Sequence, residues 1–236
     1  MINDKYIYWL NNSDEETVRE LKEIENEKDK IYDRFYKNLE FGTGGMRGIL
    51  GAGCNRINRY TIAKATKGFA DYIKECGKEA CKKGIAIAYD NRRQSRFLSE
   101  VTAGVLAYEG IKVYLFEDLR TTPELSFAVR NLGCFGGVVI TASHNPPEYN
   151  GYKLYDDTGC QFIPEIADKV ISYISKINDE FSVKCLSLEQ AGELVEIIGE
   201  SVDEPYYKEV LNLQFDKGAK RIIKAVYTPE HGTGSR

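Results

Sequence analysis

A serine, a histidine and a lysine lie close together in one stretch of this chain. Residues 141–147 read Thr-Ala-Ser-His-Asn-Pro-Pro and follow the apolar run 138–140, which predicts a loop at the end of a buried strand. Folds of the α/β class place their chemistry on such loops. Ser143 could therefore act as a nucleophile, and the Asn-Gly pair at 150–151 predicts a turn that brings Lys153 back toward it.

Two arginines accompany segments that could hold an anion. Arg47 lies in the glycine-rich segment 41–48, whose backbone amides could approach a phosphate closely. Arg92 lies in residues 89–93, just past the carboxyl end of a predicted strand, on the side where the Ser143 loop is expected. A flexible connection and a turn that starts a helix explain the same residues without a ligand, so both possibilities stay open.

Three interpretations of the serine loop can be compared. A serine hydrolase would need His144 to take the Ser143 proton, but neighbouring side chains in an extended loop point apart, and Gly-x-Ser-x-Gly is absent. In phosphoryl transfer, Ser143 would carry a phosphate while Lys153 and the two arginines stabilise charge and move protons. The third interpretation is a stiff, capped turn without catalysis. The residue types favour phosphoryl transfer over hydrolysis, and the turn remains an alternative.

The composition argues against several classes of function. A formal charge of −4 gives no basic surplus for binding a nucleic acid. No apolar run is long enough to span a bilayer, and the first residues lack the pattern of a secretory signal. The six cysteines include no C-x-x-C pair, and two histidines make no zinc cluster. We expect a protein of the reducing cytoplasm that binds neither nucleic acid nor membrane.

Hydrophobic periodicity predicts alternating strands and helices, which favours an α/β fold with a parallel core. The expected helices are 14–39, 62–76, 95–109, 122–130, 164–177 and 203–213, and the expected strands are 85–89, 113–116, 138–140, 194–198 and 222–227. Residues 192–203 read as a domain junction, and the chain stops shortly after the last expected strand. We therefore expect a first domain followed by the opening of a second.

The serine loop resembles the phosphoserine loop of the α-D-phosphohexomutases, the phosphoglucomutase and phosphomannomutase superfamily. The match rests on Thr-Ala-Ser-His-Asn-Pro at 141–146 followed by Asn-Gly-Tyr-Lys at 150–153. Other landmarks agree in chain order: 41–48 with 51–56, 89–92, 121–125 and 227–232. The 51–56 segment and the N-terminal helix resemble the branch of bacterial α-phosphoglucomutases and of the animal phosphoglucomutase/phosphopentomutase type. The resemblance covers nearly all of this chain but half or less of a typical member.

This resemblance implies a fold and a reaction. The fold is the three-layer α/β/α first domain with a mixed, mainly parallel sheet in residues 1–200, and the incomplete start of a similar second domain in residues 201–236. The reaction is a phosphoglucomutase-type interconversion of hexose 1-phosphate and 6-phosphate through a phosphoserine at Ser143 and a bisphosphate. A phosphopentomutase, a phosphomannomutase and a non-catalytic domain fragment are the alternatives.

The resemblance also implies residue roles and cofactors. Lys153 is the preferred base, with a pKa lowered by neighbouring arginines. Mg²⁺ would be held by the Ser143 phosphate and three aspartates expected beyond Arg236, with glucose 1,6-bisphosphate as activator and intermediate. The implied catalytic residues are Ser143, His144, Lys153 and Arg47, and the implied residues for binding substrate or phosphate are Arg47, Arg92, Thr141, Asn145 and Lys153. Because the C-terminal domains are the expected partners, we expect the isolated chain to be inactive.

Overall fold

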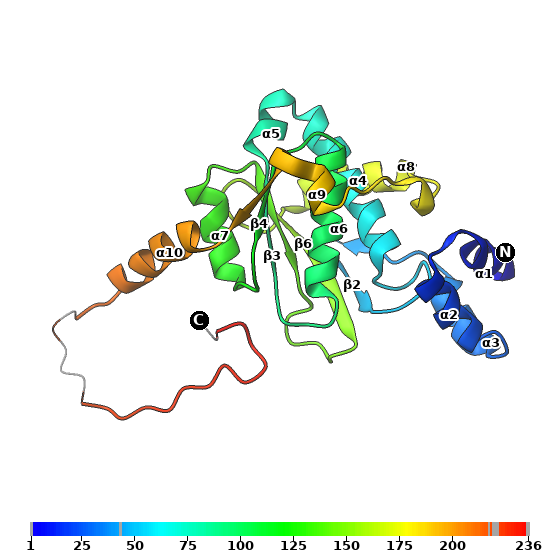
Figure 1. Cartoon of the computed structure of the whole chain (residues 1–236), viewed down its shortest axis with the longest axis horizontal. Helices are drawn as coiled ribbons and strands as arrows, with labels where there is room; N and C mark the ends of the chain where they lie inside the picture. The colour runs from blue at the N-terminus through cyan, green and yellow to red at the C-terminus, as the bar shows by residue number, and fades with distance from the viewer. Residues whose placement is uncertain (1, 43, 217, 219–221, 235–236) are drawn as a thin grey trace.

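A mixed β-sheet forms the middle layer of this protein, seen here in a computed structural model (Figure 1). The structure describes residues 2–42, 44–216, 218 and 222–234. The strands in these residues are β1 (Phe41–Gly42), β2 (Gly45–Ile49), β3 (Ile85–Tyr89), β4 (Val113–Phe116), β5 (Gly136–Ile140), β6 (Tyr149–Tyr155) and β7 (Val195–Ile198). Their order is β1-β2-β6-β5-β3-β4-β7. Strands β5, β3, β4 and β7 run parallel, whereas β1, β2 and β6 join through antiparallel pairs.

Helices cover both faces of the sheet and complete the three layers. The helices are α1 (Ile2–Asn12), α2 (Glu15–Glu23), α3 (Lys28–Phe35), α4 (Arg59–Glu75), α5 (Lys78–Lys83), α6 (Ser95–Tyr108), α7 (Thr122–Asn131), α8 (Pro164–Lys176), α9 (Leu188–Ala191) and α10 (Glu200–Asn212). Helices α4, α6 and α8 share one apolar core with the sheet, and α7 and α10 share a second. The expected α/β/α architecture is confirmed.

Side chains that alternate along the strands supply the two cores. In β3, Ile87 belongs to the core under α4 and α6, whereas Ala88 belongs to the core under α7. Small residues on the α7 side let that helix approach the sheet closely, since a Cβ on Gly137 would lie 2.7 Å from Val129. This close packing fixes the distance of α7 from the strand that precedes the serine loop.

The first three helices form a separate cluster at one end of the sheet (Figure 1). The expected single helix over 14–39 is wrong, because the chain breaks between α2 and α3. A straight helix would hold Leu21 and Phe35 roughly 20 Å apart. The break lets both reach Tyr6, whose hydroxyl donates to the Leu21 carbonyl at 3.0 Å and whose ring meets Phe35 edge-on.

Strand pairing also overrides the turn expected at residues 150–151. Asn150 and Gly151 lie inside β6, opposite Gly48 and Arg47 of β2, and the chain reverses earlier, in residues 141–148. Asn-Gly favours a turn only through local backbone preference. Here β6 has a neighbour on both sides, and the ladders to β2 and β5 outweigh that preference.

The strand expected at 222–227 is absent, because that segment has no regular secondary structure and pairs with no described strand. Its apolar side chains face solvent, with Ile222 82% and Val226 100% exposed. A β-strand needs a partner strand for its backbone hydrogen bonds, and this segment lies away from the sheet edge (Figure 1). The chain that follows this segment returns toward the carboxyl ends of the central strands, where Asn91 donates to the His231 carbonyl.

The remaining expected elements differ from the observed ones mainly at their ends. Helix α7 is capped by Thr121, which accepts from the Glu124 amide, and Pro123 lies in its first turn. Helix α10 begins at Glu200 and packs on α7, so the fold continues past residue 200. The boundary between two domains at that residue stays a prediction. None of the described helices has the length and apolar character needed to cross a membrane.

Candidate active site

The serine loop leaves β5 and holds Ser143 in an unusual backbone conformation. Ser143 has φ = 56°, in the left-handed region, and its side chain is exposed. Such a conformation costs a non-glycine residue about 1 kcal/mol or more, so neighbouring contacts must stabilise it. The Ser143 amide donates to the Thr141 hydroxyl at 3.0 Å, and the Asn145 amide donates to the Ala142 carbonyl at 3.1 Å.

The same conformation brings the side chains of Ser143 and His144 closer together than expected. The side chains of Ser143 and His144 were expected to point apart, as in an extended loop. Instead the Ser143 Oγ lies 3.4 Å from His144 Nδ1, because the positive φ turns the chain tightly at the serine. The contact is at the long limit of a hydrogen bond, so His144 is within reach of the Ser143 proton without being firmly bonded to it.

Lys153 and Arg47 lie on one face of two adjacent strands. Arg47 of β2 is opposite Gly151 of β6, and Lys153 is two residues farther along β6, so the two cations are diagonal neighbours. Lys153 is half-buried, and burial is the main cause that lowers its pKa. Arg47 lowers this pKa further, and Asp90 opposes the shift. The expected direction is therefore confirmed, with burial ahead of the arginine.

The glycine-rich segment that contains Arg47 forms strands. Residues 41–42 and 45–49 make β1 and β2, and residue 43 lies outside the described residues. Gly45 has φ = 119°, and a Cβ there would lie 1.9 Å from the Tyr152 carbonyl oxygen. The glycine therefore permits the close pairing of β2 with β6, and so sets where Arg47 lies relative to Lys153.

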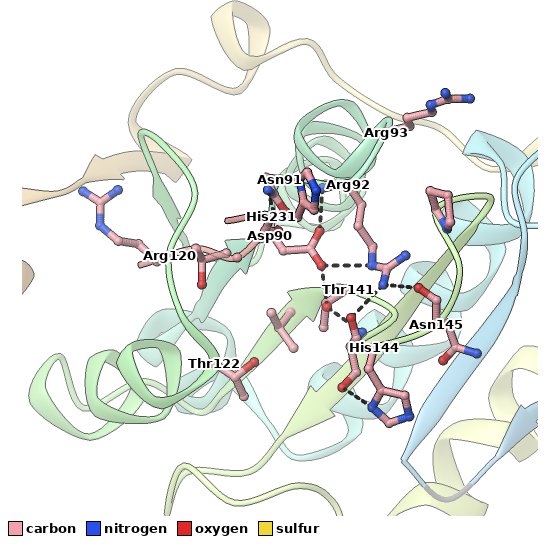
Figure 2. Close-up of a pocket in the computed structure, with 15 residues that line it drawn as sticks. Asp90, Asn91, Arg92, Arg93, Arg120, Thr122, Thr141, His144, Asn145 and His231 are labelled. Atoms are coloured by element: carbon pink, nitrogen blue, oxygen red, sulfur yellow. Dashed lines mark hydrogen bonds and ion pairs between the residues drawn. The ribbon is translucent and has the colours of Figure 1, made fainter. Parts of the chain in front are cut away.

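A cavity of about 750 Å³ opens beside the serine loop (Figure 2). Its walls come from the carboxyl ends of β3, β4 and β5, the place expected for a site in an α/β sheet. The segment 231–233 closes one side, where Asn91 Nδ2 donates to the His231 carbonyl at 2.8 Å. The lining residues are Asp90, Asn91, Arg92, Arg93, Arg120, Thr122, Val139, Thr141, Ser143, His144, Asn145, Pro147, His231, Gly232 and Thr233.

The cations in this cavity and on the strands next to it fall into two groups. Arg92 and Arg120 are engaged by protein atoms: Arg92 by the serine loop and Arg120 by Asp203, to which it donates twice at 2.8 Å. Within the described residues, no hydrogen bond or ion pair holds the side chains of the other cations, Arg47, Arg93 and Lys153. Their donors are available to an anion. Arg47 and Lys153 lie beyond the cavity lining, on the neighbouring strands.

Two other expected binding residues, Thr141 and Asn145, differ in how far they are engaged. The Thr141 hydroxyl donates to Asp90 at 2.6 Å and accepts from the Ser143 amide, so both of its roles are already filled. The Asn145 side-chain oxygen is buried and has no hydrogen-bond partner in the described part of the chain. It is an acceptor that a hydroxyl or ammonium group could satisfy.

Comparison with known proteins shows the family to which this loop and sheet belong. Residues 38–181, well over half of the chain, match the family model described as phosphoglucomutase/phosphomannomutase, alpha/beta/alpha domain I. The chain belongs to the phosphoglucomutase/phosphomannomutase family.

Named relatives extend this match to most of the chain. A phosphoglucomutase from Staphylococcus epidermidis is 36% identical over 95% of this chain, and one from Staphylococcus haemolyticus is 39% identical over 85%. The matched regions make up 40% and 36% of those relatives, so the chain spans well under half of their length.

Solved structures of the phosphoglucomutase/phosphomannomutase family share the fold. A Thermus thermophilus protein, provisionally assigned as a phosphomannomutase, superposes with a TM-score of 0.60 at 28% identity, over 75% of this chain and 36% of its own. The phosphoglucomutase parafusin from Paramecium, in an open form, superposes with a TM-score of 0.52 at 16% identity, over 76% and 36%. The second likeness concerns the fold alone.

Several residues of this family member were not expected in the site. Asp90 was considered only as a residue of a turn that starts a helix, yet it bonds to Thr141 and Ser95. Arg120 and His231 line the cavity, although neither was expected as a site residue and only His231 lies in one of the family landmarks, 227–232. Asp90 and Arg120 share one usable signal, because both come directly after predicted parallel strands. His231 also follows an expected strand, at 222–227, but that strand does not form, so the position of His231 depends on how the chain returns after α10.

The site residues of this chain do not form a magnesium site by themselves. No group of three or more acidic, histidine or cysteine side chains suited to a metal occurs in the described residues. Asp90 is the one carboxylate among the cavity-lining residues given above, and it already accepts from Thr141 and Ser95. Mg²⁺ prefers several carboxylate or phosphate oxygens, which a single occupied carboxylate does not provide.

Proposed function

We propose that this chain carries the phosphoserine of a phosphoglucomutase-type phosphotransferase, with Ser143 as the phosphate carrier. The observation that supports this most directly is the placement of Ser143. It is exposed on a fixed loop at the carboxyl end of β5, beside a cavity rich in arginine. The names of the Staphylococcus relatives favour glucose phosphate as the sugar.

The proposed half-reaction moves one phosphoryl group. A hydroxyl group of a hexose monophosphate gives its proton to a base while its oxygen attacks the phosphorus on Ser143. The bond from phosphorus to Ser143 Oγ breaks, and a hexose bisphosphate forms. The serine oxygen keeps the electron pair of the broken bond and takes up a proton. In the second half, Ser143 Oγ loses its proton and attacks the other phosphate of the bisphosphate. The bond from that phosphorus to the sugar oxygen breaks, and the sugar oxygen keeps the electron pair and takes up a proton. The isomeric monophosphate is released and the phosphoserine is restored.

Lys153 and His144 are the proposed proton carriers, and Arg47 the proposed phosphate contact. A lowered pKa gives Lys153 a larger fraction of neutral amine near neutral pH, which a general base needs. His144 Nδ1 is 3.4 Å from Ser143 Oγ and can return a proton to it. Arg47 has an unengaged guanidinium on the face of the sheet that bears Lys153, where it can stabilise the negative charge of the transferred phosphate.

Other features of the proposed enzyme depend on parts of the relatives that lie outside the region matched by this chain. The family resemblance implies Mg²⁺, which offsets phosphate charge when it is bound, and its aspartates would have to come from the rest of a full-length relative. The same holds for the groups that enclose a bisphosphate while it turns over. We therefore propose that this polypeptide alone performs single transfers and does not sustain turnover. Its six cysteines, all unpaired thiols, support a reducing compartment such as the cytoplasm.

Intact mass spectrometry of the purified chain tests this function. With glucose 1,6-bisphosphate, the wild type is expected to gain the mass of one phosphate, located at Ser143 by peptide fragmentation, and to release glucose monophosphate. Ser143→Ala should gain none. Adding glucose 1-phosphate should then discharge the labelled protein, whereas water alone should not. A wild-type chain that stays unmodified, or that is labelled at another residue, contradicts the proposal.

A further inference from the structure

The turn between β3 and α6 holds the serine loop through one side chain. Arg92 Nη2 donates to the carbonyls of Ser143 at 2.7 Å and Asn145 at 2.6 Å. Its Nη1 donates to the carbonyls of Pro146 at 2.9 Å and Tyr149 at 3.1 Å. Figure 2 shows this side chain directed at the loop, whereas neighbouring Arg93 points away from it.

The remaining nitrogen of Arg92, Nε, takes part in an ion pair. Its Nε lies 3.4 Å from Asp90 Oδ2, and the side chain is only 12% exposed. A guanidinium group has five N–H donors in a fixed plane. Four of these donors are hydrogen-bonded to main-chain carbonyls and Nε is paired with Asp90, so the guanidinium is committed to protein atoms. Arg92 was expected to contact phosphate. The hydrogen bonds described above do not support that prediction.

Asp90 holds the other side of the same serine. Its Oδ2 accepts from the Thr141 hydroxyl at 2.6 Å, and that hydroxyl accepts from the Ser143 amide at 3.0 Å. Its Oδ1 accepts from Ser95 at 2.7 Å, which ties the carboxylate to the first turn of α6. The amide and the carbonyl of Ser143 are thus both fixed from residues 90–92, which explains how its left-handed conformation persists.

The charge of Arg92 has a second consequence for a phosphorylated serine. Four carbonyl oxygens converge on the side of the loop that Arg92 occupies, and each carries a partial negative charge. Without a cation among them they would repel a phosphate dianion on Ser143. Lysine keeps the charge but cannot direct planar, paired donors at four acceptors.

We propose that Arg92, together with Asp90, is a positioning residue that holds Ser143 ready to exchange a phosphate, and is not itself a phosphate ligand. This inference rests on the proposed function of Ser143. Arg92 acts through the loop backbone. Its removal should therefore disturb the geometry of transfer more than the binding of the sugar phosphate.

The test compares Arg92→Lys with a matched control, Arg96→Lys. Arg96 is one turn away on α6, with a side chain 69% exposed and paired with Glu100, outside the cavity lining. The first measurement is peptide-resolved hydrogen exchange over residues 141–149, which needs no substrate. Arg92→Lys should speed exchange in this loop by about tenfold or more, and Arg96→Lys should not. Unchanged exchange in Arg92→Lys overturns the proposal.

The second measurement is the rate at which Ser143 takes phosphate from glucose 1,6-bisphosphate over a range of concentrations. Arg92→Lys should lower the maximal rate by about 10- to 100-fold and change the half-saturating concentration by less than about threefold. A raised half-saturating concentration with an unchanged maximal rate would instead identify a phosphate ligand and overturn the proposal.

The experiment also distinguishes a wild-type chain without phosphate transfer from an Arg92→Lys variant that does not fold. A wild-type chain that takes no phosphate refutes the function of Ser143, and hydrogen exchange still decides whether Arg92 holds the loop. If Arg92→Lys does not fold, Thr141→Val replaces it, because this change removes only the hydroxyl that joins Asp90 to the Ser143 amide. It should give the same pattern with a smaller loss of rate, and an unchanged loop and rate in Thr141→Val count against the proposal.

Discussion

Arg120 donates from Nε and Nη2 to the two carboxylate oxygens of Asp203, each at 2.8 Å, and so joins the turn before α7 to α10. Both residues are buried, and Glu124 is buried beside them. One arginine thus faces two buried acids. Burial and the neighbouring Asp203 raise the pKa of Glu124 to about 7, because the cluster balances its charge when one acid keeps a proton.

This cluster predicts that stability depends on pH through Glu124. An acid whose pKa is higher in the folded state stabilises the fold fully below its unfolded pKa, here 4.5, and loses that contribution as pH rises through about 7. Glu124→Gln imitates the protonated acid, so its free energy of unfolding should fall less between about pH 5 and pH 8, by roughly 2 kcal/mol. Urea unfolding at several pH values measures the difference between the two proteins. If the free energies of unfolding of wild type and Glu124→Gln change in parallel with pH, the prediction is contradicted.

Removing Asp203 should be costly because it leaves a buried arginine unpaired. We expect Asp203→Ala to lower the free energy of unfolding by about 3–5 kcal/mol and to loosen α10. Glu117→Ala is the control, since Glu117 is 48% exposed and lies 3.4 Å from the same arginine. Its cost should stay below about 1 kcal/mol. Equal losses in the two variants, measured by urea unfolding, would show that the buried pair has no special role.

A methyl group at Gly45 should separate β2 from β6. The Cβ of Gly45→Ala would lie 1.9 Å from the Tyr152 carbonyl oxygen, so the strands must shift, and stability should drop by more than about 2 kcal/mol. Because Arg47 moves with β2, phosphate transfer to Ser143 should slow as well. Gly42→Ala meets its nearest atom at 3.7 Å and is the matched control, with an expected change below about 1 kcal/mol. Thermal unfolding of both variants decides the point.

Lys153 is expected to serve function at the expense of stability. Burial and Arg47 lower its pKa, so the protonated amine is disfavoured in the folded state. This penalty is full below the lowered pKa, fades as pH rises above it, and is gone only above the unfolded value of 10.5. Lys153→Met should leave the free energy of unfolding at neutral pH unchanged or raise it by up to about 1 kcal/mol. It should nevertheless slow phosphate transfer by about 100-fold. Exposed Lys78→Met should change neither quantity, and a large loss of stability in Lys153→Met would assign this lysine a structural role.

Trp9 anchors the N-terminal helices and reports on them. Its ring is 1% exposed and meets Phe35, Tyr60 and Phe181 edge-on. Trp9→Ala should cost about 3–5 kcal/mol, whereas Tyr8→Ala, at a side chain that is 45% exposed, should cost far less. Since Trp9 is the only tryptophan of the chain, its fluorescence follows the unfolding of this cluster directly. Similar losses for the two variants would mean that the cluster contributes little to stability.

Much of the fold could be predicted because local patterns carried it. The strands 85–89 and 113–116 agree with β3 and β4, since short apolar runs between polar residues have few other solutions. Features that depend on distant neighbours were predicted less well. The turn at Asn150 and the strand around Val226 failed for opposite reasons: the first segment gained partner strands on both sides, and the second has none.

In the candidate site, too, local patterns were predicted well and features that depend on distant neighbours were not. Residue types and the order of motifs were enough to single out Ser143, Lys153 and Arg47 and to suggest phosphoryl transfer. Of the three, Ser143 follows a strand end, where α/β sheets gather chemistry, whereas the two cations lie within β6 and β2. The sequence could not show that Arg92 donates its hydrogen bonds to the serine loop, or that Ser143 lies in a left-handed conformation. Those facts arise from hydrogen bonds between residues 51 positions apart, which form only once β3 and β5 lie side by side.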